Sequence, residues 1–440
     1  MTNYMMRRRT ALTTLSLGLL ASCSTPKPPI VGLQIPVLPD ASALAVSPDA
    51  PAVSLPPAQA LPSWPQPLAN AAHAPGNVAA PTGLAVRWTA SVGLGGGIRQ
   101  PLLASPIMAQ GMVFTMDANA AVSAFSAADG RRLWHASTRP PHSTEQNIGG
   151  GLVFDNGRLF VSTGYGQLIS MEAGNGKVLW RQTLPFPART APMVAGSLVA
   201  LISQNDLLLT FDAQNGTPGW RFTGEVGTPG STAVAVTGAP AFADGIVVAG
   251  FASGMLAALD ANSGTPVWEQ SYASAFGQAS SLDFSDIVGA PVIANGVVYA
   301  ISLGQTLMAV DLHSGAKVWS HSASGTQALC LGGDFAFVLD HNQTLFAIHT
   351  DDGLVSWALQ MRPFHNMKRK TGPVEWAGPV LVNGMLVLTS SLGEIAFVDA
   401  AQGVIKTTAK LASPAADLPP IAADGLLLQL TRDGKLTAYS

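Results

Sequence analysis

The sequence predicts an all-β protein: an eight-bladed β-propeller with four-stranded antiparallel blades, closed into a ring by pairing of the N- and C-terminal strands. Two repeated signatures, and a mismatch between their copy numbers, lead to this prediction. The first is a polar turn that ends in Gly and is followed four residues later by Trp. The second is a Gly followed by three or four apolar residues. A period of about 45 residues with several short strands per repeat is typical of propellers.

The turn signature has seven copies, and its chemistry is that of a β-hairpin. Gly accepts a positive φ without a Cβ clash, and the short polar residue before it can bond its own backbone. Most copies also carry an Asp a few residues before the Gly, as at Asp212, Asp260, Asp311 and Asp399. The copies are Asp129-Gly130…Trp134, Asn175-Gly176…Trp180, Asn215-Gly216…Trp220, Ser263-Gly264…Trp268, Ser314-Gly315…Trp319, Asp352-Gly353…Trp357 and the degenerate Gln402-Gly403…Thr407.

The strand signature has eight copies, one more than the turn signature, and a closed ring explains the difference. The chain ends on residues 434–438, which resemble the strand before the turn in other repeats, and residues 84–88 supply the missing partner strand. Trp88 precedes Trp134 by one period, 46 residues. Closing the ring leaves no unpaired terminal blade. The eight glycines of this signature are Gly111, Gly157, Gly196, Gly245, Gly296, Gly333, Gly384 and Gly425.

The repeated tryptophans and aspartates are interpreted as architecture rather than chemistry, because they recur with the repeat. Each Trp is expected to bury a large apolar area where blades meet, and each Asp to support its turn. The structural tryptophans are Trp88, Trp134, Trp180, Trp220, Trp268, Trp319 and Trp357.

Composition narrows the possible functions. Only 11% of the 440 residues are charged and the net charge is −3, which argues against nucleic acid as a partner. No apolar run reaches the ~18 residues that a membrane-spanning helix needs. The eight histidines are scattered without metal-ligand spacing, and no phosphate-binding loop or nucleophile elbow appears. The sequence therefore predicts no catalytic residue, no metal and no cofactor. Cys330, in an apolar run, is expected to be a small buried hydrophobe.

The first 80 residues predict export and attachment. Residues 1–22 carry Arg7-Arg8-Arg9 and then an apolar segment, as in a secretory signal. Leu20-Ala21-Ser22-Cys23 resembles a bacterial lipobox, in which Cys23 is acylated; the alternative is an ordinary signal peptide with an incidental Cys. Residues 23–80, rich in Pro, Ala and Ser, predict a flexible linker, in which Trp64 either docks on the propeller or a partner or stays exposed. The propeller is expected over 81–440.

The loops between blades are where a propeller carries its binding surfaces. Four are longer than the rest: residues 140–149, 224–240, 272–291 and 361–379, the last with Lys368-Arg369-Lys370. Solvated loops without a partner are the alternative for each.

The turn motif, with its Asp, Gly and Trp, resembles the repeats of pyrroloquinoline quinone (PQQ) propellers, and the resemblance covers 81–440. One group with these repeats, the quinoprotein dehydrogenases, typically carries an adjacent Cys-Cys pair, which this chain lacks. The other is the BamB family, lipoproteins of the outer-membrane β-barrel assembly machine. Residues 284–291, 292–299 and 309–315 resemble that family's central blades, and residues 420–425 and 432–439 its last one.

The BamB resemblance implies a non-catalytic scaffold, lipid-anchored at the periplasmic face of the outer membrane, with Ser24 after Cys23 favouring that membrane. It implies binding to BamA periplasmic domains and other assembly-machine subunits, and contact with unfolded outer-membrane proteins. Two neighbouring loops would make the BamA contact. Asp286 matches the first acid of one loop, and Val288 replaces its second. The family's other loop carries Leu and Arg before its Ala-Pro; the matching stretch here, residues 232–240, has no Arg, and Val234 and Val236 would supply apolar contact. Alternatives are a PQQ-dependent dehydrogenase or PQQ-binding sensor of the periplasm, and a propeller that organises envelope polysaccharide or another complex.

Overall fold

The computed structural model describes residues 44–440, except Ile98, Thr144, Arg189, 225–237, 272–285, Ala412 and Pro414. The chain divides into two units, residues 1–40 and 41–440, and all of the described residues belong to the second. Cys23, Val234 and Val236 lie outside the described residues, as does the predicted signal segment 1–22.

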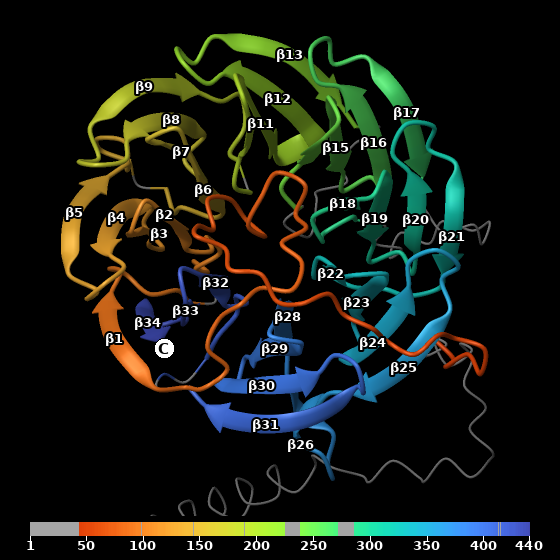
Figure 1. The fold of residues 1–440 in the computed structure, drawn as a ribbon. Helices are drawn as coiled ribbons and strands as arrows, with labels where there is room; N and C mark the ends of the chain where they lie inside the picture. Colours follow the sequence, from red (N-terminus) through yellow and green to blue (C-terminus); the bar gives the residue numbers. More distant parts are fainter. Residues whose placement is uncertain are drawn as a thin grey trace, which may run out of the picture. The chain divides into compact units, whose positions relative to one another are not determined.

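Seven blades are meanders of four consecutive antiparallel strands that run from the central channel to the rim of a ring (Figure 1). Blade 1 comprises β2 (Ile107–Ala109), β3 (Met112–Met116), β4 (Ala121–Ser126) and β5 (Arg132–Ser137), and blade 2 comprises β6 (Gly150–Asp155), β7 (Arg158–Thr163), β8 (Gln167–Glu172) and β9 (Val178–Thr183). Blade 3 comprises β10 (Met193–Ala195), β11 (Leu198–Ser203), β12 (Leu207–Asp212) and β13 (Pro218–Thr223), and blade 4 comprises β14 (Ala241–Ala243), β15 (Ile246–Gly250), β16 (Met255–Asp260) and β17 (Pro266–Ser271). Blade 5 comprises β18 (Val292–Ala294), β19 (Val297–Ile301), β20 (Leu307–Asp311) and β21 (Lys317–His321), and blade 6 comprises β22 (Cys330–Gly332), β23 (Phe335–Leu339), β24 (Thr344–His349) and β25 (Val355–Gln360). Blade 7 comprises β28 (Trp376–Val382), β29 (Met385–Ser390), β30 (Glu394–Asp399) and β31 (Val404–Lys410).

Blade 8 joins the two ends of the propeller chain, as the sequence predicts. Its inner strands are β32 (Ile421–Ala423), β33 (Leu426–Leu430) and β34 (Lys435–Tyr439), and its outermost strand is β1 (Val86–Ser91). β1 pairs antiparallel with β34, with Trp88 opposite Ala438. The described part of the chain thus holds eight four-stranded blades, which confirms the predicted eight-bladed, end-closed ring.

Two further elements interrupt the blade pattern. A 3-10 turn, η1 (Gln204–Asp206), connects β11 to β12. A short hairpin of β26 (Phe364–Asn366) and β27 (Thr371–Pro373) lies between blades 6 and 7.

Burial follows the position of a strand within its blade. The two middle strands are covered on both faces by neighbouring blades, so their residues are nearly all buried; β4, for example, is buried at five of six positions. The outermost strands have one face toward solvent and alternate between exposed and half-buried residues, as in β9. This explains a mean hydropathy of +0.29, since strands covered on both faces read as continuous apolar runs.

Each repeated Trp docks on the turn Gly of the following blade. The ring of Trp180 lies so close to Gly216 that a Cβ on Gly216 would stand 2.7 Å from the ring, and its indole Nε1 donates to the carbonyl of Ala213, 3.2 Å away. The other six tryptophans repeat this arrangement: Trp88 on Gly130, Trp134 on Gly176, Trp220 on Gly264, Trp268 on Gly315, Trp319 on Gly353 and Trp357 on Gly403. All seven tryptophans thus pack against the neighbouring blade.

The degenerate copy at Thr407 has a structural reason. Thr407 occupies the Trp position on β31 of blade 7, whose neighbour is blade 8. In blade 8 the last two strands, β34 and β1, come from opposite ends of the chain, so no Gly turn connects them. A Trp at position 407 would have no turn glycine on which to dock.

The turn aspartates support their turns, as expected. In four blades one carboxylate oxygen accepts two backbone N–H groups of the residues two and three positions later. At Asp311 these donors are His313 (3.1 Å) and Ser314 (2.7 Å). The same pattern recurs at Asp212, Asp260 and Asp399. At Asp311 the Ser314 hydroxyl and N–H hold the carboxyl pKa below its usual value.

A pair of glycine substitutions should isolate the Trp contact. Gly111 and Gly216 both have φ near +70°, at 71° and 74°, but a Cβ would meet nothing within 4 Å at Gly111 and the Trp180 ring at Gly216. Gly111→Ala is therefore expected to cost only the backbone strain, about 1 kcal/mol. Gly216→Ala should cost at least about 2 kcal/mol more, the range for overpacking. Urea unfolding of both variants measures the difference, and equal losses would contradict the docking role of Gly216.

The structure differs from the predicted linker over the described part of it. Residues 44–80 are not a free tether: they form a strap that lies against the propeller, and Trp64 is only 1% exposed, so the docking of Trp64 on the propeller is confirmed. Trp64 exchanges two backbone hydrogen bonds with Met108 of β2, at 2.7 and 2.8 Å. A segment with many prolines has few backbone donors for a sheet of its own, but those that it has pair here with the blades.

The strap crosses the central region of the ring and touches every blade (Figure 1). In each blade it contacts the innermost strand or the turn that follows it, and in blade 6 it also bonds the start of the outermost strand, β25, through Ser47 and Pro51. The inner contacts are Trp64 with Met108, Pro65 with Phe154, Gln66 with Val194, Ala71 with Phe242, Ala72 with Ile293, Leu55 with Gly332, Val78 with Leu381 and Leu61 with Asp424. His73 is buried beside blade 5, where its Nδ1 lies 2.8 Å from the carbonyl oxygen of Pro291.

Candidate partner-binding face

The loops that enter the innermost strands surround a small cavity in the centre of the ring. Its volume is about 220 Å³, and residues from six blades line it together with Pro67 of the strap. The lining residues are small or apolar and carry no charge; they include Ser105, Gly151, Thr190 and Val288. Small side chains allow the loops of neighbouring blades to approach closely around the channel.

Asp286, the acidic residue predicted to meet a partner, is largely covered. The residue is only 6% exposed. The main chain around it is fixed on both sides: Leu303 N–H donates to the Asp286 carbonyl at 2.9 Å, and Ile287 N–H donates to the Phe251 carbonyl at 3.1 Å. Asp286 thus lies in a held loop rather than on an open surface.

Val288 is more accessible than Asp286, because it is half-buried and lines the central cavity. The described ends of the two predicted contact loops also lie close together. A Cβ on Gly238, at the end of one loop, would stand 2.2 Å from the Cα of Ala290 in the other. The described ends of the loops that hold Val234 and Val236, and Asp286 and Val288, are therefore side by side.

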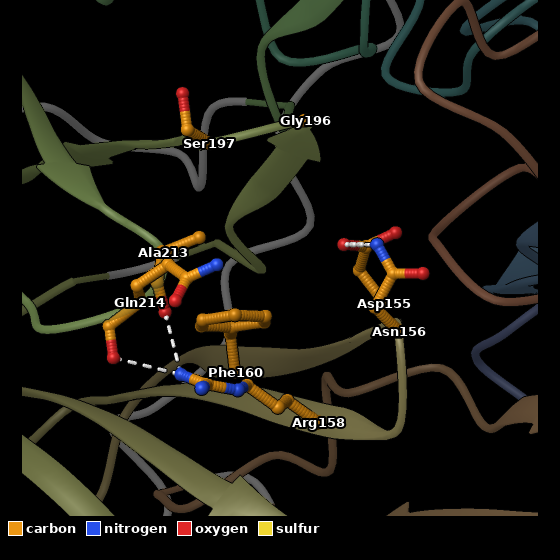
Figure 2. A pocket seen from close by; sticks show the side chains of 8 residues that line it. All are labelled: Asp155, Asn156, Arg158, Phe160, Gly196, Ser197, Ala213 and Gln214. Atoms are coloured by element: carbon orange, nitrogen blue, oxygen red, sulfur yellow. Dashed lines mark hydrogen bonds between the residues drawn. The ribbon is translucent and has the colours of Figure 1, made fainter.

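A second hollow lies between blades 2 and 3, with a volume of about 200 Å³ (Figure 2). Arg158 spans it and donates from one guanidinium nitrogen to the carbonyls of Ala213, at 3.2 Å, and Gln214, at 2.7 Å. On the other side Asn156 donates to the Asp155 carboxylate at 2.8 Å. The Arg158 guanidinium is bonded to two carbonyls of the neighbouring blade's turn, so we interpret it as a contact that holds blades 2 and 3 together.

Groups that could perform chemistry are few among the described residues. No cluster of three or more His, Cys, Asp or Glu residues suited to a metal ion occurs in that part of the chain. Cys330 is buried, as expected, and burial raises the pKa of its thiol to about 12. None of the helical segments in the described ranges is long and apolar enough to cross a membrane.

A ring of four-stranded blades, seven of them docked on the next by a Trp on a turn Gly, defines the chain as a β-propeller of the PQQ-like repeat class. The family model described as outer membrane protein assembly factor BamB matches residues 77–147 and 118–359. The chain belongs to this BamB family. The resemblance drawn from the repeats is thereby confirmed, and the match places the chain with the assembly factors rather than with the quinoprotein dehydrogenases.

Individual proteins agree with this assignment. The outer membrane protein assembly factor BamB of Shigella dysenteriae is 28% identical over 357 residues, which cover 80% of this chain and 87% of that protein. The crystal structure of BamB from Moraxella catarrhalis superimposes with a TM-score of 0.68 at 20% identity and covers 81% of this chain and 100% of that one. The quinohemoprotein alcohol dehydrogenase of Comamonas testosteroni has a TM-score of 0.66 at 13% identity and covers 86% and 80% of the two chains, which shows a shared fold.

The sequence did not reveal the strap as a part of the propeller. Its contacts are mostly backbone hydrogen bonds to strand edges, which leave no side-chain pattern. The one signal was Trp64, a large aromatic residue in a Pro- and Ala-rich stretch. His73 gave no signal, because an isolated histidine reads the same whether it is buried or exposed.

Proposed function

We propose that this chain is a lipid-anchored scaffold of the outer-membrane β-barrel assembly machine. In this proposal residues 1–22 are removed as a signal, Cys23 carries the lipid, and the propeller faces the periplasm from the outer membrane. Its function is to hold the periplasmic domains of BamA and so to assist insertion of outer-membrane proteins. Membership of the BamB family is the observation that carries the proposal.

The architecture suits a positional rather than a chemical role. Blades fastened by Trp on Gly and covered by a strap that contacts all eight form a rigid frame. Rigid frames present loops in a fixed geometry, which reduces the ordering cost of binding. The adjoining ends of the 225–237 and 272–285 loops, at Gly238 and Ala290, are the place that we propose for the BamA contact. Val288 would supply an apolar contact there.

Unfolded clients would have a second surface, the outermost strands of the blades. Each of these strands is the last in its sheet among the described residues. Several of their apolar residues are more than a third exposed: Leu133, Val178, Leu179, Val267, Val318, Val404 and Ile405. An extended client segment could add to such an edge by main-chain pairing, with its apolar side chains beside these residues.

A photo-crosslinking experiment in intact envelopes tests the BamA contact. A crosslinker at Val288 or within 232–238 is expected to capture BamA. The same crosslinker at Lys177, an exposed residue just after the Asn175-Gly176 turn at the opposite end of a blade, is the matched control and should not. Capture of BamA only from Lys177, or from none of these positions, would contradict the proposed face.

A further inference from the structure

The hairpin β26–β27 concentrates positive charge in a chain that has little of it. Residues 361–374 include Arg362, Lys368, Arg369 and Lys370 and contain no acidic residue, whereas the whole chain has a net charge of −3. Lys368, Arg369 and Lys370 are all exposed. Glu375 follows the hairpin, and Glu394 lies at its base, 3.4 Å from the Arg362 guanidinium. The three tip cations therefore have no acid within their own hairpin.

The base of this hairpin is fixed to the propeller. Arg362 donates to the carbonyls of Phe364 at 3.1 Å and His365 at 2.6 Å, which holds the first strand in place. Trp376, only 5% exposed, donates its indole N–H to the Arg362 carbonyl at 3.0 Å. The Val374 N–H bonds the Pro363 carbonyl at 2.9 Å and closes the base. The tip is thus presented by a built support, outside the ring of blades (Figure 1).

The tip also carries an apolar side chain. Met367 is 55% exposed, more than any other large apolar residue among those described, and it directly precedes the three cations. An unbranched apolar side chain beside a basic run is the combination that binds the boundary between lipid headgroups and acyl chains. Most exposed apolar residues elsewhere lie on flat outermost strands rather than on a projecting turn.

We infer that the β26–β27 hairpin binds the surface of an anionic phospholipid membrane, with Lys368, Arg369 and Lys370 at the headgroups and Met367 in the interface. A bilayer fits this surface better than a protein does. A two-stranded tip cannot bury the roughly 800 Å² per partner that a stable protein interface needs, but a few basic residues and one apolar residue are enough for weak membrane attachment.

The inference rests on the proposed lipid anchor and deepens it. A lipid at Cys23 would hold the chain near the membrane, and each Lys or Arg close to an anionic surface would strengthen that attachment about fivefold, which corresponds to about 1 kcal/mol. The described chain begins at Leu44, and the segment from Cys23 to Leu44 spans at most about 70 Å when extended. The Ser47 N–H of the strap donates to the carbonyl of Val355, the first residue of β25. The hairpin starts just after Gln360, the last residue of β25. The strand between these two points is about 20 Å long, which is shorter than the extended length of the segment from Cys23 to Leu44.

Vesicle flotation of the unlipidated chain 24–440 tests the hairpin apart from the anchor and from BamA. The described residues form one unit without residues 1–40, so this chain keeps the whole propeller. It is expected to float with vesicles of phosphatidylethanolamine containing about one quarter phosphatidylglycerol and not with phosphatidylethanolamine–phosphatidylcholine vesicles. Binding should fall as the Debye length shrinks from about 10 to about 3 Å between 0.1 and 1 M salt.

Two charge variants of equal net charge decide the site. The triple variant Lys368→Gln, Arg369→Gln, Lys370→Gln should bind anionic vesicles on the order of 100-fold more weakly, at about fivefold per basic residue. The control Arg131→Gln, Lys177→Gln, Lys317→Gln removes exposed cations that follow blade turns at the other end of the strands, and it should bind as the native chain does. Met367→Ser should weaken binding severalfold without changing its salt dependence.

A probe at the tip gives a second readout. With Met367→Cys carrying an environment-sensitive dye, emission should shift to the blue on addition of anionic vesicles; Cys330 is buried and does not compete for the dye. The inference is overturned if the hairpin triple variant binds vesicles as well as the control triple variant does, or if phosphatidylglycerol makes no difference to the native chain. Failure of the BamA crosslink leaves these outcomes unchanged, so the two proposals are tested separately.

Discussion

Replacing Trp268 by alanine is expected to lower the free energy of unfolding by about 3–5 kcal/mol, the range for removal of a buried aromatic side chain. Trp268 is 8% exposed. Its indole N–H donates to the Leu312 carbonyl at 2.7 Å, and its ring lies where a Cβ on Gly315 would stand 2.7 Å away. The substitution removes this Trp268–Gly315 contact between blades 4 and 5. Urea unfolding followed by far-ultraviolet circular dichroism measures the change.

The matched control for Trp268→Ala is Thr407→Ala, at the equivalent position of blade 7. Thr407 is exposed and has no turn glycine in the neighbouring blade, so this substitution should change the free energy of unfolding by no more than about 0.5 kcal/mol. Similar losses for the two variants would mean that the Trp-on-Gly contact does not hold the blades together.

The stability of the propeller is expected to fall as the pH drops below about 6.5, through His73. Burial lowers the pKa of this histidine to about 4, against 6.5 for an exposed one. Between these values the unfolded chain takes up a proton that the folded chain does not, so the unfolded state is favoured. The stability is complete above pH 6.5, and by pH 4 the loss should approach about 3 kcal/mol.

His73→Gln is the variant that isolates this effect. A glutamine amide N–H can replace the Nδ1 donor to the Pro291 carbonyl, and it does not titrate. The difference in unfolding free energy between the native chain and this variant should therefore change by about 3 kcal/mol between pH 7 and pH 4, while carboxylates titrate equally in both. A difference that stays constant with pH would rule out His73 as the cause.

Much of the fold could be predicted because the repeats report local chemistry. Turn glycines, turn aspartates and the Trp four residues after the Gly each mark a fixed place in a blade, and counting them revealed the closure between residues 84–88 and 434–438. The strap could not be predicted in this way. Its contacts pair residues far apart in the chain, such as Gln66 and Val194, and they use main-chain groups that every residue has.

The place of the candidate site stays a prediction. The resemblance to the family pointed to two loops, and the structure brings their described ends together at Gly238 and Ala290. The exposure of Asp286 could not be judged from its sequence, because a loop carboxylate is usually solvated, whereas this residue is only 6% exposed. The seven tryptophans could be assigned to packing, but their partner glycines in the next blade became visible only in the ring.

The pairing of Val86–Ser91 with Lys435–Tyr439 has a consequence for the order in which the protein acquires its structure. During synthesis β1 emerges long before β34, and until then it has no strand with which to pair. The circle is therefore completed only after the final residues have been delivered, and chain segments separated by about 350 residues must then find one another, which is a slow kind of encounter. A C-terminal truncation that removes β34 would leave β1 without the strand with which it pairs. Trp88 on β1 would then no longer be held against Gly130 in blade 1.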